Sequence, residues 1–165
     1  MFKKASLAVA VLVFTAAGVR AQSNIEVKPT QGSKVSGTVS VATMGKGVHF
    51  RGTLSGLTAG KHGFHIHEKG DCSAPDGTSA GGHFNPDQKP HAAPDAAERH
   101  AGDLGNIEAA ADGTAKIDMH VNGVTLGMEA NSIKGKAIIV HGGVDDFTTQ
   151  PTGNAGARQA CGVIN

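Results

Sequence analysis

A series of short alternating apolar runs, each bounded by glycine-rich turns, decides which folds are open to this chain. Residues 34–44 (KVSGTVSVATM) place Val35, Val39 and Val41 on one face, and residues 47–57 (GVHFRGTLSGL) alternate in the same way. Residues 113–121 (GTAKIDMHV) repeat the pattern, and residues 134–141 (KGKAIIVH) form a more continuous apolar run. Alternation with a period of two predicts strands, and closely spaced short strands favour an antiparallel sandwich or barrel.

Residues 68–112 interrupt this series. They are rich in Gly, Pro, Ala, Asp and His, whereas no long segment of the chain has the periodicity of a helix. A loop region of this length inside a compact domain is usually functional. We therefore expect the functional side chains to lie in this region or on the strands beside it.

The N-terminus has the pattern of a secretory signal peptide. Lys3 and Lys4 precede an apolar run over residues 5–19, and small residues follow before Gln22. The alternative is a membrane anchor, but the run is shorter than the roughly 18–20 apolar residues that a span needs. The cleavage point has no cysteine to which a lipid anchor could be attached. We predict a signal over residues 1–21 and an exported domain over residues 22–165, periplasmic in the first instance and secreted as the alternative.

Charge gives no argument for a nucleic-acid partner. Removal of the signal takes away Lys3, Lys4 and Arg20, which leaves twelve basic residues against fourteen acidic ones and a formal charge of −2. Proteins that bind nucleic acid through their overall charge are strongly basic.

The two cysteines, Cys72 and Cys161, are most simply paired in an exported chain. Two free thiols are the alternative. A bridge between them would close a loop of nearly ninety residues, which stabilises a fold by about 4–5 kcal/mol on the chain-entropy model.

Nine histidines are the chemical signature of the chain, at positions 49, 62, 65, 67, 83, 91, 100, 120 and 141. His49 and His120 point away from the apolar face of their strands and are interpreted as surface residues, and His62 as a structural hydrogen-bonding residue. His65 and His67, in GFHIHEKGDC, are two apart and share one strand face. The remaining four follow in HFNP, HAAP, RHAGD and at the end of AIIVH. Histidine with one carboxylate suits zinc, and an all-imidazole set suits copper equally well.

These motifs occur in an order that resembles the copper/zinc superoxide dismutase family, in its exported bacterial form. The resemblance includes GFHIHEKGDC, GGHFNP, HAAP, ERHAGDLGN and GNAGARQACGV and covers essentially all of residues 22–165. It implies an all-β fold, a Greek-key antiparallel β-barrel of immunoglobulin-like sandwich architecture with two long active-site loops.

The resemblance also implies a role for each residue that matches a family motif. Copper would be held by His65, His67, His83 and His141. Zinc would be held by His83, His91, His100 and Asp103, so that His83 bridges the two metals as an imidazolate. Asp145 would link His65 to His91, Cys72 and Cys161 would form the family disulfide, and Arg158 would guide the anionic substrate to the copper.

The implied reaction is 2 O2•− + 2 H+ → O2 + H2O2, with copper reduced by one superoxide and reoxidised by the next. Arg158 and His83 are then the expected catalytic residues. One alternative is an exported metal store without turnover, for which an anion guide such as Arg158 has no use. A zinc hydrolase is a weaker alternative, because four protein ligands leave zinc no open position.

The second loop departs from better-known family members. Residues 147–157 (FTTQPTGNAGA) are shortened and contain no charged residue, so Arg158 is the only cation near them in sequence. Lys69 and Lys89 are candidates for the remaining positive field. Family members are often dimers, so a homodimer is an expectation as well, and no stable membrane anchor is expected.

Overall fold

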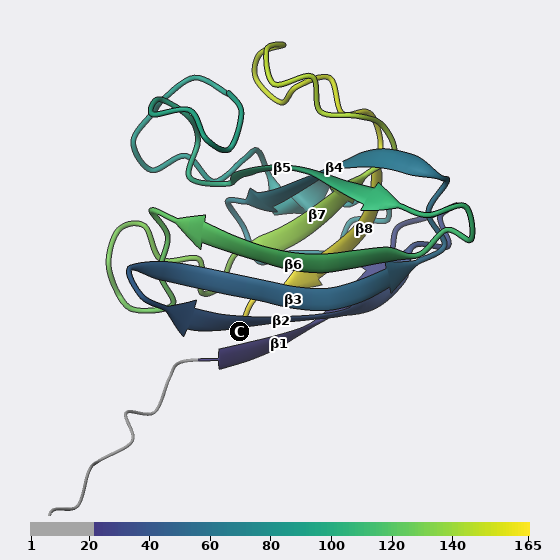
Figure 1. The fold of residues 1–165 in the computed structure, drawn as a ribbon, viewed down its shortest axis with the longest axis horizontal. Helices are drawn as coiled ribbons and strands as arrows, with labels where there is room; N and C mark the ends of the chain where they lie inside the picture. Colours follow the sequence, from purple (N-terminus) through teal and green to yellow (C-terminus); the bar gives the residue numbers. More distant parts are fainter. Residues whose placement is uncertain (1–21) are drawn as a thin grey trace, which may run out of the picture.

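Eight antiparallel strands close into one barrel in the computed structural model, which describes residues 22–165 (Figure 1). The strands are β1 (Gln22–Pro29), β2 (Ser36–Met44), β3 (Gly47–Ser55), β4 (Gly60–His67), β5 (Asp103–Ala109), β6 (Ala115–Asn122), β7 (Ala137–His141) and β8 (Arg158–Val163). Their order around the barrel is β1-β2-β3-β6-β5-β4-β7-β8. The step from β3 to β6 and back through β5 to β4 gives the expected Greek-key arrangement, and the predicted fold class is confirmed.

The alternating runs form strands because each can turn one apolar face inward. β2 buries Val39 and Val41, and β3 buries Val48, Phe50 and Leu54. Val41 lies opposite Phe50 in the β2–β3 pair, so both inward faces are in register. Burial of each such side chain stabilises the fold by roughly 1.5–3 kcal/mol, which makes a one-residue slip of the register costly.

One core joins the two halves of the barrel. Phe50 of β3 and Phe64 of β4 meet edge to face with ring centroids 6.4 Å apart. Beside them β2 and β3 approach so closely that a Cβ on Gly52 would lie 2.3 Å from the carbonyl oxygen of Thr38. Glycine is therefore required at position 52, which explains one break in the apolar pattern of β3.

Two long connections emerge at the same edge of the barrel, the upper edge in Figure 1. Residues 68–102 join β4 to β5 and include a short 3-10 helix, Thr78–Ala80, and residues 142–157 join β7 to β8. The first connection folds back on β4, since the amide of Phe84 donates to the carbonyl of Ile66 at 2.8 Å. These two segments, here called the first loop and the second loop, are the two long loops expected from the sequence.

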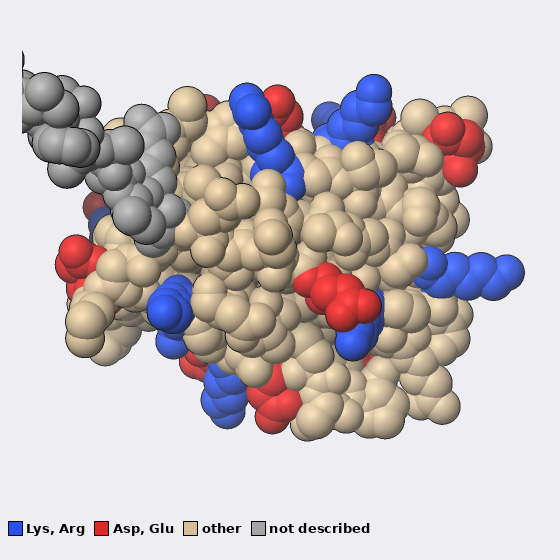
Figure 2. Space-filling view, turned by 90° about the horizontal axis from the view of Figure 1, so that it is seen from below, with Lys and Arg blue, Asp and Glu red and all other residues tan. Residues whose placement is uncertain are grey.

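The opposite face of the barrel shows charges of both signs, interspersed. Figure 2 views it from below, away from the two loops. Arg51 and Asp118 make one of the exposed ion pairs of the described residues, and Lys28 and Glu26 make another. No helix among residues 22–165 is long and apolar enough to cross a membrane. The predicted signal, residues 1–21, lies outside the described part of the chain.

Candidate metal centre

Four histidines converge beneath the two loops, and each directs a nitrogen without a partner at the same space. His65 and His67 lie on β4, His141 ends β7, and His83 is placed by an isolated bridge to His67. The four ligand atoms lie within 4.8 Å of one another, and all four side chains are buried. Their unpartnered atoms are Nδ1 of His65 and Nε2 of His67, His83 and His141.

The strand alternation explains how β4 presents two of these rings. Phe64 and Ile66 alternate with the histidines and enter the core, so His65 and His67 point together to the other side. β7 pairs with β4, with Ile139 opposite His65, and this pairing places His141 beside them. The shared face that the sequence predicted for His65 and His67 is therefore observed.

The opposite ring nitrogens are held by the protein, and this fixes where the free lone pairs point. Nδ1 of His67 donates to the carbonyl of Gly81 at 2.9 Å, and Nδ1 of His141 to that of Gly156 at 3.2 Å. Nε2 of His65 donates to a carboxylate oxygen of Asp145 at 2.8 Å. A buried nitrogen normally has a partner, so four orphaned lone pairs aimed at one point fit a soft or borderline metal ion.

A second cluster shares His83 with the first. The Nδ1 atoms of His83, His91 and His100 lie 2.7, 2.9 and 3.2 Å from the same oxygen, Oδ1 of Asp103. Asp103 begins β5 directly opposite His65 of β4, and its side chain is fully buried. Three rings around one carboxylate oxygen form a four-ligand set of the type that holds structural zinc.

The electrostatics of the two clusters differ. In the first cluster, burial lowers the pKa of His65 to about 4, of His67 to about 2 and of His141 to about 3, so all three rings are neutral at pH 7. In the second cluster, burial alone would lower the pKa of His91, but hydrogen bonds with Asp145 and Asp103 outweigh it and raise that pKa. Burial alone would raise the pKa of Asp103, but hydrogen bonds from His83, the Ala92 amide and His91 outweigh it and hold that pKa well below its usual range. Neutral imidazoles and one carboxylate are the protonation states that metals require.

Asp145 joins the two clusters. One oxygen accepts from Nε2 of His65 at 2.8 Å and the other from Nε2 of His91 at 2.9 Å. Gly153 lies against this junction, and a Cβ there would come within 1.9 Å of Oδ1 of Asp145. The link between His65 and His91 that the resemblance implied for Asp145 is present in the structure, and it leaves room only for glycine at position 153.

Two side-chain amides that sequence reasoning missed hold this arrangement from outside. Asn106 of β5 accepts from the amide of Asp145 at 2.8 Å and donates to its carbonyl at 3.0 Å. Gln150 of the second loop does the same for His91, with both distances 2.8 Å. Each amide makes hydrogen bonds to the backbone groups of a distant residue. A contact of this kind leaves no recognisable motif in a single sequence.

Arg158 begins β8 and reaches the first loop. Its Nη1 donates to the carbonyl of Gly77 and its Nη2 to that of Gly81, each at 2.7 Å. The same Gly81 oxygen also accepts a hydrogen bond from Nδ1 of His67. Arg158 and His67 therefore bind the same carbonyl group. A cavity of about 390 Å³ opens beside the arginine and is also lined by Thr30, Asp76 and Thr78.

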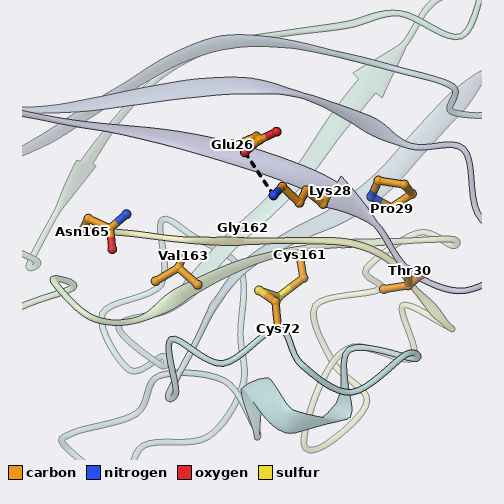
Figure 3. A pocket seen from close by; sticks show the side chains of 9 residues that line it. All are labelled: Glu26, Lys28, Pro29, Thr30, Cys72, Cys161, Gly162, Val163 and Asn165. Carbon is orange, nitrogen blue, oxygen red and sulfur yellow. Dashed lines mark ion pairs between the residues drawn. A yellow bond between two sulfur atoms is a disulfide. The ribbon is translucent and has the colours of Figure 1, made fainter.

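Cys72 and Cys161 form a disulfide with their Cα atoms 5.8 Å apart. The bridge ties the start of the first loop to β8, three residues from Arg158. A separate cavity of about 420 Å³ lies beside the bridge. Figure 3 shows its lining, which includes Lys28 and Glu26, an ion pair with a separation of 3.2 Å. None of the histidines lines that cavity.

The structure also shows where three further histidines and one lysine of the sequence analysis lie. His62 is buried and donates Nδ1 to the carbonyl of His141 at 2.9 Å, which confirms a structural hydrogen bond. His49 and His120 lie outside the barrel, beside Asp118 and Asn122 respectively. Lys89, one candidate for the positive field, lies 3.5 Å from Glu98, so its charge is partly compensated.

Comparison with known proteins gives one consistent result. Residues 35–164 match the family model described as copper/zinc superoxide dismutase. The extracellular superoxide dismutase [Cu-Zn] of Caenorhabditis elegans is 44% identical over 139 residues, which cover 80% of this chain and 62% of that longer protein. Superoxide dismutase [Cu-Zn] 2 of Mesembryanthemum crystallinum is 44% identical over 140 residues, covering 80% of this chain and 88% of the plant protein.

A third relative and a solved structure agree. The extracellular superoxide dismutase [Cu-Zn] of Haemonchus contortus is 43% identical over 148 residues, covering 84% of this chain and 78% of the nematode protein. The crystal structure of the clock protein EA4 superposes with a TM-score of 0.79 at 35% identity, covering 88% of this chain and 94% of that one.

Proposed function

The chain belongs to the copper/zinc superoxide dismutase family and is an oxidoreductase that uses copper and zinc, and we propose which of its residues carry each part of the reaction. The substrate is superoxide, and the products are oxygen and hydrogen peroxide. The observation that carries the assignment is the set of four buried, unpartnered imidazole nitrogens that converge on one space.

Copper is held by His65, His67, His83 and His141. Their free nitrogens have no other partner among the described residues, and burial lowers the pKa of His65, His67 and His141, so these three rings are neutral at pH 7. Copper bound there supplies a centre that accepts one electron and returns it, because both of its oxidation states tolerate nitrogen ligands.

Zinc is held by His83, His91, His100 and Asp103. The set is complete with four protein ligands, so its role is to organise the first loop and to orient His83. His83 offers Nδ1 to this set and Nε2 to the copper set, and therefore bridges the two.

The substrate is an anion, and Arg158 is the residue that receives it. Two of its five N–H groups are bound to Gly77 and Gly81, which holds the guanidinium still, and the others remain for the anion. Nε2 of His83 is a buried nitrogen without a partner among the described residues, and it would hold and pass on a proton for the peroxide product. Asp145 keeps His65 and His91 in fixed tautomers while this occurs.

Export follows from the sequence and is consistent with two relatives that are named extracellular. We assign residues 1–21 to a secretory signal and residues 22–165 to the dismutase domain, with the periplasm of a bacterium as the proposed location. A homodimer and the lack of a membrane anchor also belong to this proposal.

The test combines metal analysis with an assay. The purified protein is expected to contain one copper and one zinc per chain and to sustain superoxide disproportionation measured directly by the decay of superoxide. His67→Ala should lose copper and activity while the circular dichroism of the barrel is retained. Full activity in that variant would remove His67 from the copper set, and a wild type that binds both metals without turnover would favour the metal store.

A further inference from the structure

Gln150 makes a two-bond contact between the two loops at one residue, His91. Its Oε1 accepts from the backbone amide of His91 and its Nε2 donates to the carbonyl of the same residue, both at 2.8 Å. The two residues are 59 positions apart in the chain. The contact therefore joins the second loop to the first at a residue that the proposed function assigns to zinc.

All four polar groups of His91 are held by this arrangement. Asp103 and Asp145 hold the ring at Nδ1 and Nε2, at 2.9 Å each, and Gln150 holds the backbone N–H and C=O. A ring fixed at both nitrogens can still tilt if its backbone moves. Once the backbone is held as well, the direction in which Nδ1 points into the second cluster is set.

The chemistry of the amide is specific to this task. Glutamine offers one donor and one acceptor on adjacent atoms, which match the N–H and C=O of a single residue. A carboxylate of the same shape offers only acceptors, so it would place an oxygen against the carbonyl of His91. The contact needs an amide and not merely a polar side chain.

The second loop is built so that Gln150 starts from a fixed place. The amide of Gly153 donates to the carbonyl of Thr149 at 2.7 Å, and the amide of Asp146 donates to the carbonyl of Gly153 at 2.9 Å. Gln150 therefore extends from a closed turn of the second loop and contacts the first loop directly. The turn itself contains no lysine or arginine.

We propose that Gln150 is a positioning residue for the zinc site, acting through the backbone of His91. The proposal rests on the proposed function, since it requires His91 to be a zinc ligand. Its consequence is that the second loop, short and uncharged as it is between residues 147 and 157, controls how firmly zinc is held in the first.

The experiment uses the full protein loaded with copper and zinc and two variants, Gln150→Leu and Gln150→Glu. Leucine removes both hydrogen bonds without adding a charge, whereas glutamate keeps the volume, replaces the donor with an acceptor and adds a negative charge. The control is Thr149→Val, which removes a side-chain hydrogen bond of the same loop that does not reach His91. Three quantities are measured: the rate of zinc transfer to a chromogenic chelator, the visible bands of Co²⁺ bound in place of zinc, and the unfolding midpoint of the metal-free protein.

Both Gln150 variants are expected to release zinc about tenfold faster, at the lower end of what loss of a ligand's supporting partner costs. Their Co²⁺ bands should shift, whereas Thr149→Val should match the wild type in both measurements and should have a similar metal-free midpoint. The inference would be overturned, and the zinc assignment left standing, if both Gln150 variants kept the zinc release rate and Co²⁺ bands of the wild type. The same would follow if Thr149→Val released zinc as fast as the Gln150 variants. A wild type whose Co²⁺ spectrum shows no histidine-ligated site would overturn the zinc assignment and this inference with it.

Discussion

At the scale of the residue, Arg158 is a half-buried cation whose position is fixed by backbone carbonyls. Its side chain is anchored by the carbonyls of Gly77 and Gly81, and the second of these also accepts from His67. The residues 147–157 beside it carry no charge, and Lys89 is paired with Glu98. We therefore propose that Arg158, together with the exposed Lys69 of the first loop, attracts the anion.

Arg158→Ala is expected to lower the rate constant for superoxide about tenfold or more, with both metals still bound, because charge steering contributes on that scale. The rate of the wild type should fall as ionic strength rises, since screening acts over about 8 Å at physiological salt, and the variant should lose much of this dependence. The measurement is rate against ionic strength at matched metal content.

Arg158→Lys serves as the control for charge. It keeps the charge but cannot bind both carbonyls in the planar geometry of a guanidinium, so an intermediate rate with the wild-type salt slope is expected. If Arg158→Ala kept the rate and slope of the wild type, the attracting field would have to come from other residues.

At the scale of the element, the first loop owes its order to Asp103 as well as to its own contacts. Oδ2 of Asp103 accepts from the backbone amides of Ala92 and His100 at 3.1 and 2.9 Å. Within the loop, Asn85 binds both backbone groups of Lys89 at 2.8 and 3.0 Å. The loop therefore has a scaffold that is partly independent of the metal.

Asp103→Ala should lower zinc affinity, speed hydrogen exchange across residues 84–102 and lower the melting temperature of the zinc-loaded protein, because metal binding stabilises the folded state. Hydrogen exchange with mass spectrometry and zinc titration check this. Asp95→Ala, an exposed carboxylate in the same loop, should change neither. Equal zinc content and exchange in Asp103→Ala and the wild type would contradict the prediction.

Sequence reasoning predicted the strands whose alternation is clean, such as β2, β3 and β6, because the period of two is a local property. The resemblance to the family motifs implied the residues of both clusters, and the structure brings those residues together. Sequence reasoning could not find Gln150 or Asn106. Their partners are backbone groups of distant residues, and only the folded chain shows which amide reaches which peptide.

At the scale of the molecule, the disulfide joins the first loop to the last strand across 89 positions. Its removal in a Cys72→Ala, Cys161→Ala variant is expected to lower the free energy of unfolding by about 4–5 kcal/mol on the chain-entropy model. Denaturant unfolding of the metal-free proteins measures the difference. A change below about 1 kcal/mol would show that the barrel holds the loop without the bridge.

The carbonyl of Gly81 also limits which changes of loop length this fold can accept. Arg158, the proposed anion-binding residue, and His67, a proposed copper ligand, both donate to this carbonyl. One peptide unit therefore sets the distance between the two side chains. The residues just before Gly77 support the other carbonyl that holds Arg158, since the carbonyl of Ala74 accepts from the amide of Gly77 at 2.9 Å and Asp76 lines the cavity beside the arginine. Insertions in evolution should therefore be excluded from the whole stretch between Ala74 and Gly81, because each would move one of the two oxygens to which Arg158 is tied.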